Sequence, residues 1–422
     1  MFLLNVGYRE SVLADVEELK GAVYLAGSHS NVRFTRKSSP ELGRVMLDPQ
    51  LYLAGLDRSA CTKTCGRLAT HPWFCVPDIP EFDSGLTGVR EWQRSVEEAA
   101  ARRWPGRAPQ GPLVEQSCRT AIECQLQFGC THIILPAPLI EEREDEGGTL
   151  AQWIDAGLSV LSEMDVSEPA VATVAVSDVT LNNEAFGQSG FLDALVDQVS
   201  ARDGLAGVYI VISQTVGTQH PFVTQELVLR AYLRLSKAFQ GAGMSNVIVN
   251  FADVFGFVCA AAGATDIVTG PSQNLRRLSL AAFRDEGYGI ALPYFYSHRM
   301  IGEFLTETDL NRLSSARLMR RVLDQTPHSQ DLMDAIANRQ TAADLPQWAE
   351  SRNNILAAQK HFICRLALEG ARFRKMSRQG RESIVRDWLE DAAAGSLYLR
   401  SRLRESDIGR IAPAQNWLEV LD

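Results

Sequence analysis

The chain alternates short, wholly apolar runs with longer segments in which apolar residues recur every three or four positions. Polar residues follow most of the apolar runs, a pattern typical of buried parallel strands joined by helices. The clearest case is residues 243–299, where the pattern predicts strand, helix, strand, helix and strand. The predicted strands are residues 22–27, 44–49, 131–136, 170–177, 207–213, 246–251, 266–269 and 289–297. Residues 1–8 are predicted as a short extra strand and residues 11–20 as a helix.

Roughly eight strands alternating with helices indicate a (β/α)8 barrel of the TIM type. We predict this barrel over residues 1–304, with a long insertion at about residues 50–127, after the second predicted strand. No strand pattern is visible in the insertion, and loops of this length are usually lids or small subdomains. Residues 305–422 are predicted to be an all-helical C-terminal region. A doubly wound open sheet is the alternative, but it needs a switch point that the pattern does not show.

Composition and charge fit an ordinary globular protein. Apolar residues make up 45% of the chain and charged residues 22%, and the net charge of −9 does not favour binding to a polyanion by the protein as a whole. Eight cysteines spread through a long chain indicate reduced thiols, so we expect a cytoplasmic location. We expect no secretory signal, and no apolar run approaches the roughly 18–20 residues that cross a bilayer.

Three residues at or near predicted strand ends are candidates for catalysis, because catalytic groups in such barrels come from the carboxyl ends of several strands. Asp48 and Asp178 are candidates for acid–base chemistry if they are buried near each other, and His298 for proton transfer near neutral pH. The structural alternative is that each aspartate caps the following helix and that His298 only supports the fold.

The loops after the later strands are candidates for binding a phosphorylated or nucleotide-like ligand, since phosphate sites in these barrels commonly lie there. Gly270 permits close approach of the backbone, Ser272 or Gln273 can begin a helix, and Arg276 supplies positive charge. A plain turn is the alternative interpretation. The full set of predicted ligand-binding residues is Arg33, Arg36, Asn250, Asp253, Gly270, Ser272, Gln273 and Arg276.

A cluster of potential metal ligands lies in the insertion. Cys61, Cys65, His71 and Cys75 are close in sequence, and a zinc site needs about four such groups. Their spacing matches no strong zinc signature, and buried cysteines usually act as small hydrophobic residues. We therefore predict no metal site from the sequence, which specifies no cofactor.

Residues 365–381 carry a local excess of positive charge. The residues singled out for a nucleic-acid surface are Arg372, Arg374, Lys375 and Arg378. Such a patch can hold a phosphate backbone, although the overall acidity of the chain favours a solvated helix end as the explanation.

Three functions are compatible with these features. The first is an enzyme whose site lies in the barrel mouth and takes a phosphorylated or nucleotide-like ligand. The second is a non-catalytic barrel that serves as a subunit of a multiprotein assembly. The third is a transglycosylase-like base-exchange enzyme, in which the basic C-terminal helices hold a nucleic acid and the barrel accepts a flipped base.

Overall fold

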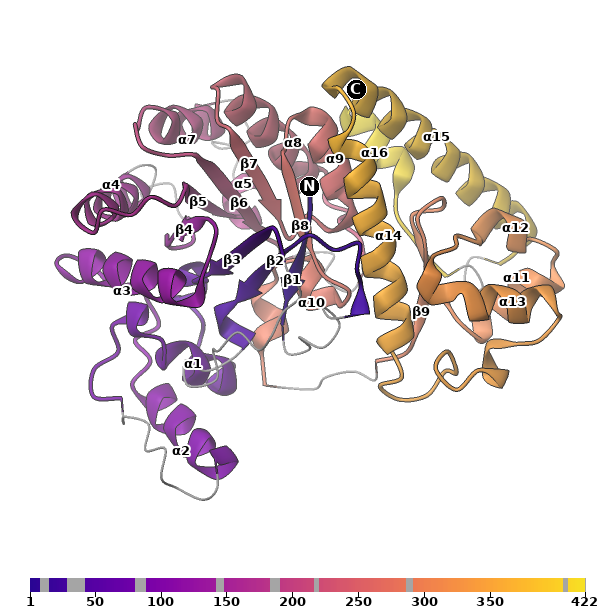
Figure 1. The fold of residues 1–422 in the computed structure, drawn as a ribbon, viewed down its shortest axis with the longest axis horizontal. Helices are drawn as coiled ribbons and strands as arrows, with labels where there is room; N and C mark the ends of the chain where they lie inside the picture. Colours follow the sequence, from indigo (N-terminus) through magenta and orange to yellow (C-terminus); the bar gives the residue numbers. More distant parts are fainter. Residues whose placement is uncertain are drawn as a thin grey trace.

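The structure is a computed structural model that describes residues 1–7, 15–28, 42–79, 89–141, 148–182, 190–215, 220–285, 291–404 and 409–421. Its centre is an eight-stranded parallel sheet with the strand order β3-β2-β1-β8-β7-β6-β5-β4 (Figure 1). The strands are β1 Phe2–Val6, β2 Gly21–Leu25, β3 Arg44–Asp48, β4 Ile133–Leu135, β5 Ala170–Ser177, β6 Gly207–Ser213, β7 Asn246–Asn250 and β8 Asp266–Thr269.

The sheet curls into a nearly closed ring. The strands at its two ends, β3 and β4, are joined by Thr131, which directly precedes β4. The backbone N–H of Thr131 donates to the carbonyl oxygen of Val45 at 2.8 Å, and the N–H of Val45 donates to the Thr131 hydroxyl at 3.1 Å. With helices interleaved between the strands, this arrangement confirms the predicted (β/α)8 TIM-type barrel.

The identity of one barrel strand differs from the prediction. The strand β1 lies between β2 and β8 and pairs in parallel with both, so it is part of the ring and not an extra strand. The prediction that residues 289–297 form a barrel strand is wrong. Within it, β9 (Tyr294–Ser297) pairs antiparallel with β10 (Gly302–Leu305), because the chain reverses at residues 298–301. The strand β11 (Arg410–Ile411) extends this small sheet, so residues 305–422 are not wholly helical.

Helices of very different length surround the barrel. They are α1 Thr62–Ala69, α2 Val89–Arg102, α3 Leu113–Phe128, α4 Gly148–Glu163, α5 Asp178–Asn182, α7 Gly190–Ser200, α8 Glu226–Gly241, α9 Gly256–Ala262 and α10 Gln273–Arg276. The first three lie between β3 and β4. The predicted helix at residues 11–20 is not found at residues 15–20, which form turns, and its remainder lies outside the described residues.

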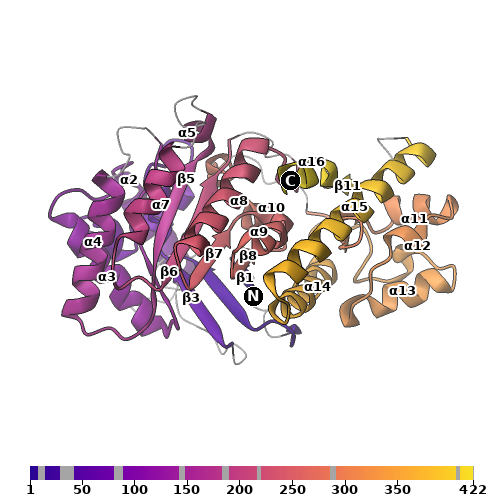
Figure 2. The ribbon, with the colours of Figure 1, turned by 90° about the horizontal axis from the view of Figure 1, so that it is seen from above.

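The C-terminal region contains further helices, some of which cover the barrel. They are α11 Thr308–Ser315, α12 Met319–Val322, α13 Gln330–Ala337, α14 Leu356–Arg374, α15 Arg378–Arg402 and α16 Ala414–Leu421. The helix α14 packs against β1, α15 against α9, and α16 against α8 (Figures 1 and 2). At the first contact Gly370 leaves no room for a side chain, because a Cβ there would lie 2.7 Å from Phe2 Cβ. The longest described helices, α14 and α15, carry many charged residues, and none of the described helices combines the length and the apolar character that crossing a bilayer needs.

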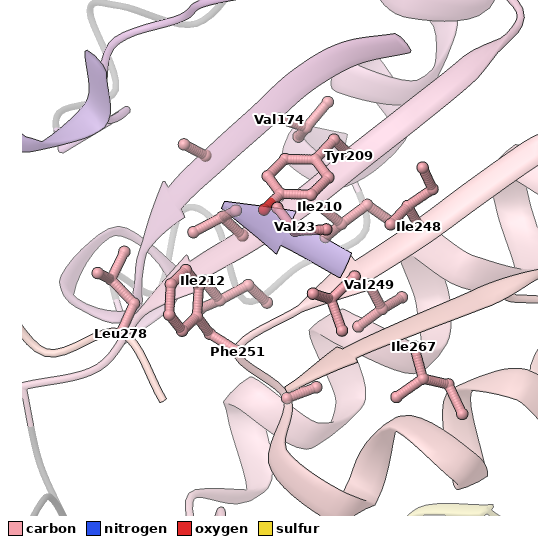
Figure 3. Packing of buried hydrophobic residues seen from close by; sticks show 14 of the residues in the cluster. Val23, Val174, Tyr209, Ile210, Ile212, Ile248, Val249, Phe251, Ile267 and Leu278 are labelled. Carbon is pink, nitrogen blue, oxygen red and sulfur yellow. The ribbon is translucent and has the colours of Figure 1, made fainter. Parts of the chain in front are cut away.

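Two hydrophobic cores hold these layers together. The larger one fills the barrel and the space beneath its helices, where Val23, Val174, Tyr209 and Val249 are among the buried side chains (Figure 3). The smaller core lies around β9, β10 and β11, and its largest member is Trp348. The C-terminal region therefore packs both on the barrel and around its own small sheet.

Candidate functional site

A cleft of about 760 Å³ opens at the carboxyl ends of β1 and β2. Its walls come from these two strands, from α1 and α2, from the segment that follows β8, and from α14. The polar or charged residues that border it are Asn5, Ser28, Gln50, Lys63, Thr64, Arg67, Gln93, Glu97, Ser272, Asn274 and Gln359. Its position matches the end of a (β/α)8 barrel where functional sites occur.

Two buried amide side chains border this cleft and keep a carbonyl oxygen without a partner. Asn5, on β1, is 1% exposed; its Nδ2 donates to Asn250 Oδ1 at 2.6 Å and to the Leu275 carbonyl at 2.9 Å. Its own Oδ1 has no hydrogen-bond partner among the described residues, and neither has Oε1 of Gln359, which is 8% exposed. Such a group costs about 1–3 kcal/mol when it stays unpaired, so its persistence needs an explanation.

Charged groups from the insertion face the same cleft. Lys63 and Arg67 lie one helical turn apart on α1 and therefore share a face. Arg67 Nη1 donates to the Gly27 carbonyl at 3.3 Å, which ties α1 to the end of β2. Glu97, from α2, accepts a hydrogen bond of 2.6 Å from Gln93 Nε2. The cleft thus combines cations, one carboxylate and several amides.

Beneath the cleft, Asp48 is enclosed in the barrel by hydrogen-bond donors. Its Oδ2 accepts from the hydroxyls of Tyr52 at 2.6 Å and Tyr209 at 2.9 Å, and its Oδ1 accepts from the backbone of Gln50 at 2.9 Å. Burial raises the pKa of Asp48 to about 6, although the three donors oppose that rise. Asp48 does not border the cleft. Its hydrogen-bond partner Gln50 does border the cleft, and the Gln50 side chain accepts from the N–H of Gly27 at 2.7 Å.

The same hydrogen bonds continue across the barrel to Asn5. Asn250 Nδ2 donates to the Tyr209 hydroxyl, and Asn250 Oδ1 accepts from Asn5. This buried polar chain, Asp48–Tyr209–Asn250–Asn5, links β3, β6, β7 and β1 and brings together two residues predicted separately, Asp48 and Asn250. The sequence contained a signal for the two that were missed, because Asn5 and Tyr209 are polar interruptions of apolar strands.

The other predicted catalytic residues have different surroundings. Asp178 begins α5, and its Oδ2 accepts from the N–H of Thr215 at 2.7 Å, which ties the ends of β5 and β6. His298 follows β9 in the C-terminal region, where its ring stacks on Trp388 with centroids 4.6 Å apart. Burial lowers the pKa of His298 well below its ordinary value, and nearby arginines add to this effect. Among the described residues, neither side chain hydrogen-bonds to the buried polar chain.

A small pocket of about 150 Å³ adjoins His298. Glu369 Oε2 lies 4.0 Å from His298 Nε2, and Asp324 accepts from the His298 backbone at 2.9 Å. Arg365 pairs with both acids. The charges around this pocket are therefore largely balanced by one another.

The predicted ligand residues after β7 and β8 divide into two groups. Ser272 borders the cleft, and Gly270 allows the chain to pass close to Leu275, while Gln273 begins α10. Asp253 and Arg276 are instead buried outside the described lining of the cleft.

The buried pair is enclosed by further charges and rings. Arg276 Nη2 lies 2.6 Å from Glu303, its Nε lies 3.9 Å from Asp253 Oδ1, and its guanidinium covers the ring of Phe362 at 4.1 Å. Burial raises the pKa of Asp253 to about 7. The guanidinium of Arg276 thus interacts with groups of the protein itself. Arg33 and Arg36 lie outside the described residues.

The four residues considered as metal ligands do not share a site. Cys61 and Cys65 are buried, and His71 Nε2 lies 3.0 Å from the Ala26 carbonyl. Sγ of Cys75 lies 3.8 Å from the Leu113 carbonyl oxygen. Within the part of the chain that the structure describes, the one group of three close His, Cys, Asp or Glu ligands is elsewhere.

The basic residues of the C-terminal helices lie near the opposite end of the barrel. Arg374 borders a second cleft, of about 560 Å³, together with Arg44 and Asp266, which begin β3 and β8. Arg372 lies 3.5 Å from Glu369, so its charge is already paired. Arg378 lies 3.1 Å from Glu382 and is likewise paired, whereas Lys375 is exposed. The basic patch therefore belongs to the amino-terminal face of the barrel.

No protein-family model matches the chain, and comparison with curated proteins and with solved structures gives no significant match. The fold by itself defines the class, a (β/α)8 barrel of the TIM type with a cleft at its carboxyl-terminal mouth.

Proposed function

We propose that the protein is an enzyme that binds a phosphorylated or nucleotide-like small molecule in the cleft at the barrel mouth. The observation that carries this proposal is the pair of buried carbonyl oxygens of Asn5 and Gln359, two residues that border the cleft, which have no hydrogen-bond partner among the described residues. If these amide side chains turn toward the cleft, a ligand that presents N–H or O–H groups can satisfy both oxygens. Nucleobases and sugars carry such groups.

The charge and size of the cleft favour the same kind of ligand. Lys63 and Arg67 offer positive charge for a phosphate, and arginine suits phosphate geometry especially well. The volume of about 760 Å³ falls within the range of roughly 300–1,000 Å³ that small-molecule sites occupy. Apolar residues such as Leu275 and Phe283 complete the walls and provide surface against which a ring can pack.

We assign proton transfer to Glu97, the one carboxylate among the described lining residues. Asp48 takes a positioning role in this proposal, since all of its hydrogen bonds fix Gln50 and the two tyrosines beneath the cleft. The long polar chain through the barrel centre then serves to hold Asn5 and Gln50 in fixed orientations.

The test is calorimetric titration of the full chain with nucleoside monophosphates and sugar phosphates, and with the same compounds lacking phosphate. We expect binding that weakens without phosphate and falls roughly tenfold in Gln359→Leu, which removes one hydrogen bond. Lys63→Met with Arg67→Met should lower affinity for the phosphorylated forms alone. Arg230→Met, on the exposed face of α8, is the control and should bind normally.

Turnover separates an enzyme from a binding protein. Glu97→Gln should retain ligand affinity while losing conversion of the ligand that binds best. Wild-type protein that binds none of these compounds would refute the proposal. Binding with no conversion in wild-type protein would leave the non-catalytic subunit as the better interpretation.

Geometry disfavours the other two functions. A barrel that serves only as a subunit has no need for polar groups at its mouth, yet this mouth keeps an open cleft bordered by polar and charged side chains. In the base-exchange hypothesis the basic patch and the mouth act on one strand, but Arg374 lies by the starts of the barrel strands. If the patch and the mouth serve one nucleic acid, the double substitution Arg374→Glu with Arg378→Glu will weaken both the binding of the small ligand at the barrel mouth and the retardation of oligonucleotides. We expect instead that the affinity for the small ligand does not change.

A further inference from the structure

Three side chains that can bind a metal ion meet where the barrel contacts the C-terminal region. Glu18 lies in the turn before β2, His328 in η9 (Pro327–Ser329), and Cys364 on α14. One ligand atom from each lies within 4.8 Å of the other two. Glu18 lies more than 300 positions before the other two in the sequence, so the three residues do not form a recognisable sequence motif.

The backbone that carries Glu18 is held in place. Val16 and Leu19 on either side of it are buried, and the N–H of Leu19 donates to the Val16 carbonyl at 3.1 Å. Lys360 of α14 lies 2.7 Å from Asp15 and ties this turn to the helix that carries Cys364. Glu18 therefore approaches Cys364 from a fixed direction.

His328 is anchored in a similar way. Thr326 and Ser329 form a capping box around η9, and the Thr326 hydroxyl lies 2.9 Å from Nδ1 of His361. His361 is itself buried on α14, with Nε2 2.7 Å from the Tyr296 carbonyl. A site whose ligands are held by such supporting contacts loses little conformational entropy when an ion binds.

The donor set indicates the kind of ion. A tetrahedral zinc site places its ligand atoms roughly 3.3–3.8 Å apart, so a separation below 4.8 Å requires only a small contraction. A thiolate and an imidazole suit Zn²⁺ far better than Mg²⁺ or Ca²⁺, which prefer oxygen ligands. Three protein ligands leave a fourth position for water or for a group from a substrate.

We propose that Glu18, His328 and Cys364 form a binding site for one Zn²⁺-class ion that joins the barrel to the C-terminal region. One negative charge from the carboxylate and one from the thiolate then balance the charge of the ion. A cysteine binds a metal ion as the thiolate, so binding releases the thiol proton and affinity falls as pH decreases. This site is independent of the mouth cleft and of the function proposed for it.

The experiment uses the full chain, treated with a chelator and then titrated with Co²⁺ and Zn²⁺. We expect one equivalent of Co²⁺ with a visible thiolate-to-cobalt charge-transfer band, displacement by Zn²⁺, and no response to Mg²⁺. Proton release should approach one per ion in an unbuffered titration.

Substitutions assign the ligands. Cys364→Ser should abolish the charge-transfer band, while His328→Gln and Glu18→Gln, at half-buried positions, should weaken binding by roughly 100-fold. Cys124→Ser changes a half-buried cysteine outside the group and should bind Co²⁺ as the wild type does. Absence of Co²⁺ uptake, or a cobalt spectrum unchanged by Cys364→Ser, would overturn the proposal. If Cys364→Ser fails to fold, an unchanged affinity in both other variants would also overturn it.

Discussion

Tyr209 on β6 donates a hydrogen bond of 2.9 Å to Asp48, which ends β3, across the interior of the barrel. The order of strands places four others between them on one side of the ring and two on the other. This bond therefore connects opposite parts of the sheet through its centre. A carboxylate in that position is stable only because three donors surround it.

Tyr209→Phe should destabilise the protein, because Asp48 loses a donor and the Asn250 side chain loses its acceptor. The expected loss in free energy of unfolding is about 1–3 kcal/mol, measured by urea denaturation. Tyr398→Phe is the matched control, since Tyr398 lies at the surface and its ring contacts with Arg321 and Arg402 survive the change. Equal effects of the two substitutions would show that the hydroxyl of Tyr209 contributes nothing.

The raised pKa of Asp48 gives stability a specific dependence on pH. The native state holds this proton until a pH of about 6, while the unfolded chain releases it near pH 4. Between these values the native state binds more protons, so its contribution to stability decreases as pH rises and is constant above about pH 6.

Unfolding of wild type and Asp48→Asn across this range isolates the contribution. The stability of wild type relative to the variant should decrease by roughly 3 kcal/mol from pH 4 to pH 6, because one pKa unit corresponds to about 1.4 kcal/mol. A relative stability that is flat, or that increases with pH, would mean that Asp48 ionises normally in the folded protein.

Gly370→Ala should separate α14 from β1. Alanine improves helix propensity by about 1 kcal/mol, but its Cβ would lie 2.7 Å from Phe2 Cβ and 2.8 Å from Phe2 N, so the helix must shift. We expect a net loss of about 1–2 kcal/mol in unfolding free energy. Gly380→Ala in α15 has room for the methyl group and should be neutral or stabilising. Similar changes in unfolding free energy for both substitutions would show that α14 and β1 are not closely packed at Gly370.

Glu303→Gln should destabilise the protein by about 3 kcal/mol, since it leaves the buried guanidinium of Arg276 with only the more distant Asp253. The pKa of Asp253 should also fall, because Glu303 now helps to raise it. Thermal and urea unfolding measure the first effect and carboxyl-resolved NMR titration the second. Glu226→Gln, an exposed partner of Arg230, should change stability by less than about 0.5 kcal/mol.

The sequence predicted those parts of the barrel whose signals are local. The strands at residues 170–177 and 207–213 have the predicted bounds, because each is a long apolar run that ends in a polar residue. Periodicity cannot tell which runs pair, however. From the sequence alone, either of two short apolar runs, Phe2–Val6 or Tyr294–Ser297, could be the eighth strand of the barrel. Only their pairing in the structure distinguishes them.

The site was predictable only in part for the same reason. Position at a strand end identified Asp48, Asn250 and Ser272, which the structure places in or beneath the cleft. Gln359 is on a helix more than 80 residues beyond the last barrel strand, and its role depends on how α14 packs. The positive charge of Arg276 can be read from the sequence, so this residue was predicted to bind a ligand. Its partner Glu303, which neutralises that charge, is distant in sequence, so the ion pair could not be predicted.

The packing of Gly370 on Phe2 has a consequence for biosynthesis. The strand β1 pairs with β2, which follows closely in sequence, but its other neighbour, β8, is synthesised some 260 residues later and the covering helix α14 after about 350. Until then one edge of β1 and the face that α14 covers lack their permanent partners. The nascent chain must therefore carry a half-protected strand through most of its synthesis, and we expect it to depend on chaperones more than a barrel closed by adjacent segments would.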